Sequence, residues 1–488
     1  MRNPVLVAAV AAGKASALAT RVFGRGGGTA LPGLVAQALY PSVLRDLTAQ
    51  LPEGCVVVTG TNGKTTSSRM LGSILDAAGL HPLHNRSGSN LERGLVSTVI
   101  GAATPGAGLP GGIRVGLFEV DEAAISTVLP SLRPRVTVFN NLFRDQLDRY
   151  GEIDAVYSRW LAALPRLAPR SALVLNADDP AIAYLAFAKG LRAAPHSFGI
   201  SDRSHALGAL PHAADSISCP RCNSRLQYSL ILLSHLGHWR CDNCGLERPE
   251  PEVAASRVLL HGTDKSELTL TTPLGELDIT LQVPGLYNVY NALSAATAAL
   301  AMGTSLAHIK VGLEAFSSAF GRIERVAIPG ADNKSLLMAL VKNPVGFNEV
   351  LRMLFSEEQA ITVDNGLQPS PARPRHLLII INDLTADGRD VSWLWDVDFE
   401  LLADAPGGVA SVFVSGIRAA DMALRLKYAG VDPTRITSGE DIAETLDKAL
   451  RNLPNGETLY ICPTYTAMLA FRKLLHERGW VNKQFWDD

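Results

Sequence analysis

The sequence predicts an α/β protein with a doubly wound, mostly parallel central sheet, a small cysteine-containing insert and a second, Rossmann-like α/β unit. From Cys55 to about residue 200, short β-branched segments alternate with helical ones, which is typical of a parallel sheet covered by helices. Two C-x-x-C pairs then interrupt this alternation, and a second series of apolar strands and helices follows residue 325. Because 488 residues are too many for one core, we divide the chain into a helical segment (1–50), a central domain (51–325, insert at about 215–250) and a C-terminal domain (326–488).

The N-terminal segment is expected to form helices on either side of a glycine-rich break at residues 24–28. Residues 1–12 combine one arginine with a short Ala/Val run, which resembles a secretory signal but fits an amphipathic helix as well, and we favour the helix. No apolar run reaches the roughly 18 to 20 residues needed to span a bilayer. The net charge of −2 gives no electrostatic case for a nucleic-acid partner.

Residues 55–71 have the strand–turn–helix layout of a phosphate-binding loop. A valine-rich strand breaks at Gly60, and a helix begins at Lys64. Glycines let backbone N–H groups surround an anion, the helix N-terminus adds a positive dipole end, the lysine reaches the outer phosphates and a hydroxyl group meets Mg²⁺. The strict Walker pattern has another glycine where this chain has Val58, so the alternative is an ordinary turn with a surface lysine. We favour the phosphate loop, with the candidate binding residues Thr61, Asn62, Gly63, Lys64, Thr65 and Thr66.

The other predicted strands of the central domain also end in polar side chains, where ligands of such sheets collect. Glu119 follows the second strand and could reach a magnesium ion at the loop, although an acidic strand end is often a solvated turn. Asn176 ends a later strand and could read a base edge, whereas Asp178 or Asp179 could cap the next helix. The predicted strands are Val56–Thr59, Arg114–Val120, Val136–Asn140 and Ala172–Asn176.

The insert is predicted to be a structural zinc ribbon. Its two C-x-x-C knuckles supply four thiolates, which satisfy tetrahedral Zn²⁺ and leave no ligand position open. Redox use of one pair is the less favoured alternative, and His235 and His238 are expected to be bystanders. The ligands are Cys219, Cys222, Cys241 and Cys244; with Cys55 and Cys462 in strand contexts, this usage suits a reducing compartment.

After the ribbon, residues 258–283 alternate as hairpins, and an alanine-rich helix begins near Pro284. Asn288 and Asn291 share one face of that helix, where two amides could bind a planar base or merely cap the helix. In the C-terminal domain, the loop 382–398 contains five aspartates and two tryptophans, which favours a binding surface. The strands predicted there are His376–Ile381, Val409–Val414 and Thr458–Cys462.

These motifs, in this order, resemble the ATP-binding apparatus of the Mur ligases. The zinc ribbon, the lack of a preceding UDP-binding domain and the segments Lys342–Asn348 and Asp387–Asp390 are most similar to the MurT branch, the ligase-like subunits of lipid II isoglutaminyl synthase. The resemblance implies nucleotide binding by the loop with Asn176, Asp179, Asn288 and Asn291, magnesium on Thr65 and Glu119, and catalysis by Lys64, Glu119, Arg322 and Asp390.

The resemblance further implies ATP-dependent amidation of the D-glutamate α-carboxylate in the lipid II stem peptide, through an acyl phosphate. It implies the cofactors ATP, Mg²⁺ and Zn²⁺, a cytoplasmic location at the inner membrane face, and a GatD-type glutamine amidotransferase partner that supplies ammonia. Asp390 matches the aspartate that completes that partner's Cys/His pair.

Some positions depart from the Mur pattern. Gln146 and Tyr287 stand where many Mur ligases carry histidine, and Lys342-Asn343-Pro344 departs from the Asp-x-x-His-Asn-Pro pattern of the amino-acid-adding enzymes. An alternative function is a Mur or folylpolyglutamate-type ligase that adds an amino acid to a carboxylate. A nucleotide-gated protein whose ribbon contacts nucleic acid is a third hypothesis, weakened by the low density of basic and aromatic residues in the ribbon.

Overall fold

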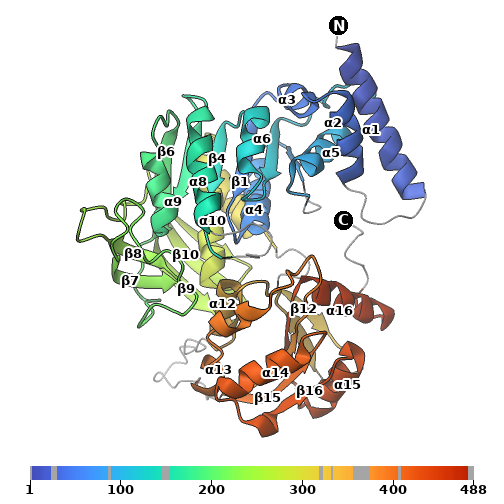
Figure 1. Ribbon diagram of the computed structural model, residues 1–488, viewed down its shortest axis with the longest axis vertical. Helices are drawn as coiled ribbons and strands as arrows, with labels where there is room; N and C mark the ends of the chain where they lie inside the picture. Colours follow the sequence, from blue (N-terminus) through green and yellow to red (C-terminus); the bar gives the residue numbers. More distant parts are fainter. Residues whose placement is uncertain are drawn as a thin grey trace.

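The computed structural model describes residues 3–22, 30–85, 89–144, 153–317, 323–330, 333–355, 374–404 and 408–481. They form two large sheets with helices on both faces and a two-stranded hairpin, and the two sheets lie in separate halves of the molecule (Figure 1). The α/β class and the mostly parallel strand arrangement predicted from the sequence are confirmed.

The first sheet has nine strands in the order β11-β10-β9-β6-β5-β4-β1-β3-β2. Neighbours from β2 to β9 run parallel, and β9, β10 and β11 form an antiparallel meander, as the alternating segment 258–283 predicts. The strands are β1 (Cys55–Thr59), β2 (Pro82–His84), β3 (Val115–Glu119), β4 (Val136–Phe139), β5 (Ala172–Asn176), β6 (Ala194–Ile200), β9 (Val253–His261), β10 (Lys265–Thr272) and β11 (Gly275–Leu281).

Helices cover both faces of this sheet, which explains why its central strands are apolar throughout. Val56 and Val58 of β1 join a core with α4 (Lys64–Ala77), α10 (Leu286–Ala301) and α11 (Leu306–Glu314). Cys55 and Val57 face a second core. Its helices are α1 (Pro4–Val22), α2 (Leu31–Leu39), α3 (Val43–Thr48), α5 (Glu92–Ala102), α6 (Ile125–Leu132) and α8 (Ile153–Ala163).

The N-terminal helices therefore belong to the central half of the molecule. Leu6, Val10 and Ala36 are buried in the same core as α5. Among the described residues, no helix is both long and apolar enough to cross a membrane.

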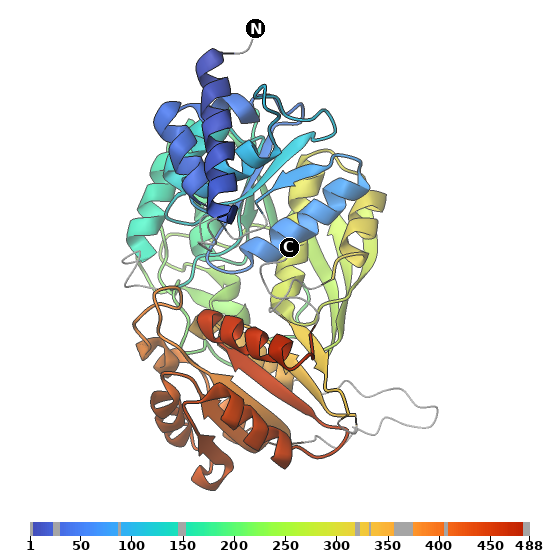
Figure 2. The same cartoon turned by 90° about the vertical axis from the view of Figure 1, so that its right-hand side faces the viewer.

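The second sheet has six strands in the order β12-β13-β17-β14-β15-β16, all parallel except the β12–β13 pair. Three strands match the sequence expectation: β14 (Arg375–Ile380), β15 (Val409–Ser415) and β17 (Thr458–Pro463). The sequence did not predict β12 (Glu324–Ala327), β13 (Ser335–Met338) or β16 (Ile436–Ser438), which have only three or four residues each. The helices are α12 (Pro344–Phe355), α13 (Leu401–Asp404), α14 (Ala419–Tyr428), α15 (Ile442–Asn452) and α16 (Tyr465–Glu477). Helices α15 and α16 pack on the same face of the sheet, in front of it in Figure 2.

The cysteine insert forms the hairpin β7 (Gln227–Leu233) and β8 (Leu236–Arg240), flanked by the two knuckles. It is docked on the carboxyl end of β5, because the Trp239 indole donates to the Ala177 carbonyl at 3.1 Å and the Gly237 amide donates to the Asp178 carbonyl at 3.0 Å. The neighbouring short helix α9 (Pro180–Tyr184) contributes Ala183 to the small core of the insert.

Candidate active site

The turn between β1 and α4 is held in place by contacts with the end of β4 and with α10. Gly63 has a φ of +81°, and a Cβ atom there would overlap the amide oxygen of Asn291. Asn141, just after β4, accepts from the Asn62 amide through its side chain at 2.8 Å and donates back to the Asn62 carbonyl at 3.1 Å. The glycine is therefore required where α10 approaches the loop, and the strand–turn–helix geometry expected of a phosphate loop is present.

Lys64 is buried at the first turn of α4. Its Nζ lies 2.7 Å from Glu122 Oε2, and the two side chains are 9% and 7% exposed. Burial acts to lower the pKa of Lys64, but the carboxylates of Glu122, Glu119 and Asp121 outweigh it and leave that pKa above its ordinary value. The lysine is thus a fixed positive charge, and Glu122 is a partner that the sequence reasoning missed.

The two predicted magnesium ligands lie side by side. Thr65 Oγ1 donates to Glu119 Oε2 at 2.7 Å, because β1 and β3 are adjacent parallel strands. The backbone of Glu119 is held on both sides by Asn85, whose side chain accepts from its N–H at 2.9 Å and donates to its carbonyl at 2.8 Å. One hydroxyl and one carboxylate next to a buried lysine are oxygen donors that fit Mg²⁺. Asn85 was not predicted, because no local pattern marks it.

Buried side chains connect α4, β4 and α10 in one polar network. Ser67 Oγ accepts from Asn140 Nδ2 at 3.0 Å and donates to Asn291 Oδ1 at 3.1 Å. Asn291 in turn donates to Asn288 Oδ1 at 3.2 Å, and Ser294 donates to Asn140 Oδ1 at 2.6 Å. Asn288 and Asn291 therefore share one helix face, as predicted.

A cavity of about 150 Å³ begins at the phosphate loop and extends over α10. Most of its wall is apolar, and polar groups gather at the loop end, an arrangement suited to a planar base joined to phosphates. The ribbon and the second sheet both contribute to the wall. The lining includes Asn62, Gly63, Thr66, Leu233, Leu236, Tyr287, Asn288, Asn291, Phe316, Ile323, Leu340, Lys342, Val345, Gly346 and Glu349. Burial raises the pKa of Glu349, against the opposing effect of Arg352.

The second half of the molecule touches the loop directly. Asn343 Nδ2 donates to Asn62 Oδ1 at 2.9 Å, and Lys342 Nζ donates to the Thr61 carbonyl at 3.3 Å. The Asn343 side chain also accepts from the Gly346 amide at 2.9 Å and so caps α12. Residues of both halves of the chain therefore form the wall of the cavity.

Asn176 and Asp179 do not line this cavity. Asn176 is 1% exposed and donates to the Asn140 carbonyl at 3.0 Å, so in this structure its side chain is not directed at a base. Asp179 caps α9 by accepting from the Ala181 and Ile182 amides and also accepts from the Leu142 amide, as a helix-capping residue does. Both fix the carboxyl ends of β4 and β5. The predicted residues Arg322 and Gln146 lie outside the described residues.

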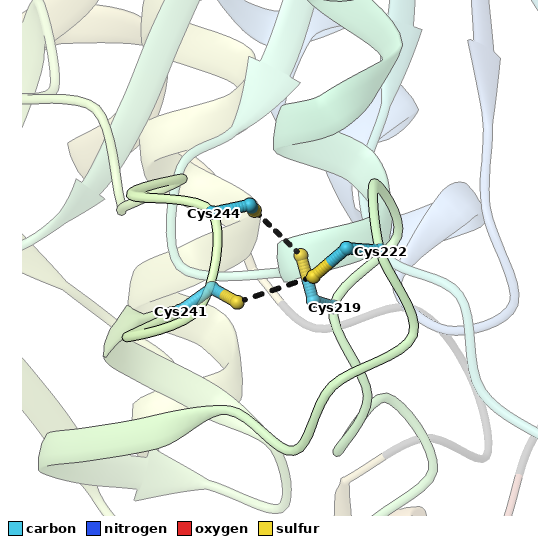
Figure 3. A group of neighbouring side chains, drawn as sticks. All are labelled: Cys219, Cys222, Cys241 and Cys244. Carbon is cyan, nitrogen blue, oxygen red and sulfur yellow. Dashed lines mark hydrogen bonds between the residues drawn. The ribbon is translucent and has the colours of Figure 1, made fainter.

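The four ribbon cysteines converge on one point (Figure 3). All their sulfur atoms lie within 4.8 Å of one another, with 3.6 Å between Cys219 and Cys244 and 3.5 Å between Cys222 and Cys241. Hydrogen bonds from Asn243 and Ser224 lower the pKa of Cys222 to about 5, whereas burial raises the pKa of Cys219 to about 12. Four converging thiols fit a tetrahedral metal ion with no ligand missing.

The two ribbon histidines are not members of this cluster. The His235 ring packs against Phe143 with the centroids 4.8 Å apart, and the His238 ring contacts the Ile200 carbonyl at 2.9 Å. The expectation that they are bystanders to the cysteine site is confirmed for the described residues.

The loop after β14 places its two central aspartates, Asp387 and Asp390, in different environments. Asp387 is buried and accepts from the Thr466 amide at 2.7 Å, and burial raises its pKa despite these hydrogen bonds. Asp390 is exposed and accepts from the Ser392 amide at 2.8 Å, which lowers its pKa. Asp390 is therefore an ionised, accessible carboxylate. Nearby, Trp395 is 51% exposed, whereas Trp393 is partly buried against Phe347.

Two family models match the chain. The model described as Mur ligase middle domain matches residues 58–219, and the model described as MurT ligase C-terminal matches residues 340–468. The lipid II isoglutaminyl synthase (glutamine-hydrolyzing) subunit MurT of Streptococcus pneumoniae R6 is 32% identical over 476 residues, which cover 97% of each chain. The same subunit of Staphylococcus aureus N315 is 32% identical over 464 residues, 94% of this chain and 95% of the relative.

Solved structures show the same architecture. A pseudomurein peptide ligase type C from Methanothermus fervidus superposes with a TM-score of 0.65 at 21% identity, over 90% of this chain and 81% of that one. MurF from Acinetobacter baumannii gives 0.63 at 18% identity, over 91% and 80% of the two chains. At such identities the likeness concerns the fold alone, whereas the sequence match to MurT subunits extends along almost the whole chain. The chain belongs to the Mur ligase family of enzymes, in its MurT branch.

Proposed function

We propose that this protein is the ligase subunit of a lipid II isoglutaminyl synthase, which amidates the α-carboxylate of D-glutamate in the lipid II stem peptide to D-isoglutamine. The observation that carries the proposal is the match to MurT subunits over 97% of both chains. The buried lysine, the adjacent Thr65 and Glu119 oxygens and the cavity over α10 support ATP as the energy source.

The reaction requires activation because a carboxylate would have to expel oxide. Transfer of the γ-phosphoryl group of ATP to a carboxylate oxygen gives an acyl phosphate and ADP. Ammonia then attacks the acyl carbon, and the C–O bond to phosphate breaks; the proton lost from nitrogen passes to the departing phosphate, which yields the amide and hydrogen phosphate. Such a transfer depends on positioning and charge neutralisation more than on covalent chemistry by the protein.

The chain supplies charge at three places. Lys64 holds positive charge at the phosphate loop, Thr65 and Glu119 would hold Mg²⁺, which neutralises phosphate charge when bound, and we assign Arg322 to the same task. Thr61, Asn62, Gly63 and Thr66 form the rest of the phosphate cradle. Asn288 and Asn291 line the cavity, Asn291 beside Gly63 of the loop and Asn288 with its amide donating to the Pro284 carbonyl at 2.7 Å. Asn176 and Asp179 support the strand ends behind the cavity.

Ammonia is proposed to come from glutamine hydrolysed by a partner subunit. A glutaminase nucleophile needs an accessible thiol with a lowered pKa. Burial raises the pKa of both Cys55 and Cys462 to about 12, and the other four cysteines form the ribbon cluster, which we assign to zinc. The exposed carboxylate of Asp390 fits the role of orienting the catalytic histidine of a GatD-type partner.

Asp390→Asn tests this assignment. With the amidotransferase, ATP and lipid II, the variant is expected to lose glutamine-supported amidation by at least about 100-fold, because a neutral amide no longer orients and stabilises the partner's histidine. Reaction with free ammonium should change little. The product is followed by mass spectrometry, where exchange of a hydroxyl for an amino group is distinct from addition of an amino acid.

Asp396→Asn is the matched control, since Asp396 lies in the same acidic loop with its side chain 40% exposed. It should retain both activities. Equal loss of glutamine- and ammonium-supported activity in Asp390→Asn would contradict the role of Asp390, and a product enlarged by an amino acid would instead establish the Mur or folylpolyglutamate-type alternative.

A further inference from the structure

Helices α1 and α2 form an antiparallel pair at the periphery of the molecule, and α1 is the outermost helix at its end of the molecule (Figure 1). The Asn3 side chain contacts the Tyr40 hydroxyl at 3.3 Å, so the start of α1 lies beside the end of α2. Farther along, Gly13 of α1 approaches the Pro32 carbonyl at the start of α2. One long side of the pair is buried on α5, and the other is left open.

The open side of the pair is apolar along both helices. Helices on the surface of soluble proteins normally turn polar side chains to water. Among the positions of the two helices whose burial the structure describes, all the exposed ones are apolar; they are Pro4, Val5, Ala8, Ala11, Ala15, Leu18 and Ala19 on α1, and Leu31, Leu34, Ala38 and Leu39 on α2. Leu18 is 65% exposed and Leu39 53%. Such a face is matched to an apolar environment outside the protein.

The charge of the same segment selects among the environments that could cover this face. Residues 1–44 contain no aspartate or glutamate and four basic residues, Arg2, Lys14, Arg21 and Arg25, whereas the whole chain has 45 basic and 47 acidic residues. The next charged residues, Arg45 and Asp46, pair with each other at 2.8 Å. Two copies that met through this segment would bring together two stretches of the same positive sign. An anionic lipid surface, in contrast, offers negative headgroups beside an apolar layer.

We propose that α1 and α2 are a docking platform for the surface of a membrane containing anionic lipids. The helices would lie in the interface, since no described helix can cross a membrane. This inference goes beyond the proposed function, but it gives that function a physical setting, because a lipid-linked substrate is confined to a membrane. Binding can be measured without turnover, so the two proposals can fail separately.

The test is co-sedimentation of the full chain with vesicles of phosphatidylcholine alone or mixed with phosphatidylglycerol. Wild-type protein should bind the mixed vesicles more tightly, and added salt should weaken the binding. The variant Leu18→Glu/Leu34→Glu places a carboxylate on each helix of the open face and should reduce binding at least about tenfold. Both leucines are exposed, so the thermal unfolding midpoint should be unchanged, and this is checked first.

Leu274→Glu is the matched control. Leu274 is 64% exposed in the turn between β10 and β11. The Leu274→Glu protein should bind vesicles as tightly as the wild type. Failure of the wild type to prefer anionic vesicles, or equal binding by all three proteins, would overturn the proposal. A concentration-dependent dimer abolished by Leu18→Glu/Leu34→Glu would assign the face to a second copy instead. Loss of vesicle binding with intact amidation of a short-chain, water-soluble substrate would leave the proposed function standing.

Discussion

Lys64 shows how single residues set the charge of the site. Its ammonium group is buried next to Glu122, with Glu119 and Asp121 close enough to raise its pKa. A buried charge that loses its partner is far more costly than an exposed one. The loop therefore keeps its positive charge, and the acidic end of β3 is part of the same electrostatic unit.

Glu122→Gln is expected to lower the free energy of unfolding at neutral pH by about 3 kcal/mol, because it leaves Lys64 without its nearest counter-charge. Burial acts to raise the pKa of Glu122, but Lys64 and Lys342 outweigh it and leave the pKa below the ordinary 4.5. The folded pKa thus lies below the unfolded one, so the stabilisation is complete above about pH 4.5 and is lost as the pH falls through the folded value. Urea unfolding of the wild type and of Glu122→Gln at several pH values should show that the difference between their free energies of unfolding shrinks as the pH falls below about 4.5.

The control is Glu444→Gln, which removes a surface pair with Lys448 in which the glutamate side chain is 65% exposed. Its effect should stay below about 0.5 kcal/mol. An equal effect of both substitutions would show that the Lys64–Glu122 pair contributes no more than a surface bridge.

The site residues that could be predicted from the sequence are those that belong to a short local pattern. The turn from Gly60 to Lys64 and the amides one helical turn apart in α10 are such patterns. Asn85 and Glu122 were not found, because their partners lie 34 and 58 positions away in the sequence and only the parallel sheet brings them together. Asn176 was singled out from the sequence, but its hydrogen-bond partner was not predicted. An amide at the end of a strand can donate to a ligand or to a neighbouring carbonyl equally well.

The ribbon hairpin is the element whose position adds most to the sequence interpretation. The sequence predicted a structural metal module, and the four cysteines do converge. The hairpin tip, however, also lies against the site: Leu233 and Leu236 line the cavity, and His235 packs on Phe143. The ribbon is therefore part of the cavity wall, which periodicity and cysteine spacing could not reveal.

Leu236→Ala is expected to weaken ATP binding about fivefold or more, because it removes apolar surface from the cavity wall. Leu226→Ala is the matched control, since Leu226 is 3% exposed in the small core of the insert and does not line the cavity. Each variant should lower the free energy of unfolding by about 2 to 4 kcal/mol, because removing a buried leucine side chain leaves a cavity. Only Leu236→Ala should change the dissociation constant, measured by calorimetry; an equal change in both would mean that general loosening of the insert is responsible.

Removal of the metal with a chelator should affect both properties together. Without the zinc ion that we assign to them, the four thiolates no longer share a central cation that holds the two knuckles together. The thermal midpoint and the affinity for ATP are therefore expected to fall in parallel. Differential scanning fluorimetry and calorimetry on the same chelated sample measure the two quantities. Unchanged stability and affinity after verified metal loss would contradict a structural role for the site.

The two halves of the molecule meet at the phosphate loop. Asn343 reaches Asn62, and Lys342 reaches Thr61, so the entrance of α12 contacts the turn that begins α4. The cavity wall combines residues from both halves, including Val345 and Glu349 of α12. Contact between the two halves therefore shapes the cavity that we assign to the nucleotide.

Asn343→Ser separates this contact from the helix cap. Serine caps a helix about as well as asparagine, but its side chain is too short to reach Asn62. The variant should unfold at nearly the wild-type temperature yet bind ATP about fivefold more weakly. Asp441→Ser is the control, because Asp441 caps α15 by accepting from the Glu444 amide and is remote from the loop; unaltered ATP affinity in Asn343→Ser would show that the contact does not support nucleotide binding.

The arrangement of the two halves was the least predictable feature from the sequence. Apolar runs located the long strands, since those strands are buried on both faces. The short strands β12, β13 and β16 gave no periodic signal, and their pairing depends on contacts far along the chain. The predicted domain boundary at residue 325 falls inside β12 (Glu324–Ala327), which is a strand of the second sheet.

The polar network around Asn140 constrains how this family can vary. Its side chain bonds Ser67 on α4 and Ser294 on α10, and its carbonyl accepts from Asn176 on β5. Replacing any one of these residues leaves another buried polar atom without its partner. Natural variation at these four positions should therefore be correlated, and a chimera that takes α4 from one relative and α10 from a distant one should fold poorly unless the two helices are inherited together.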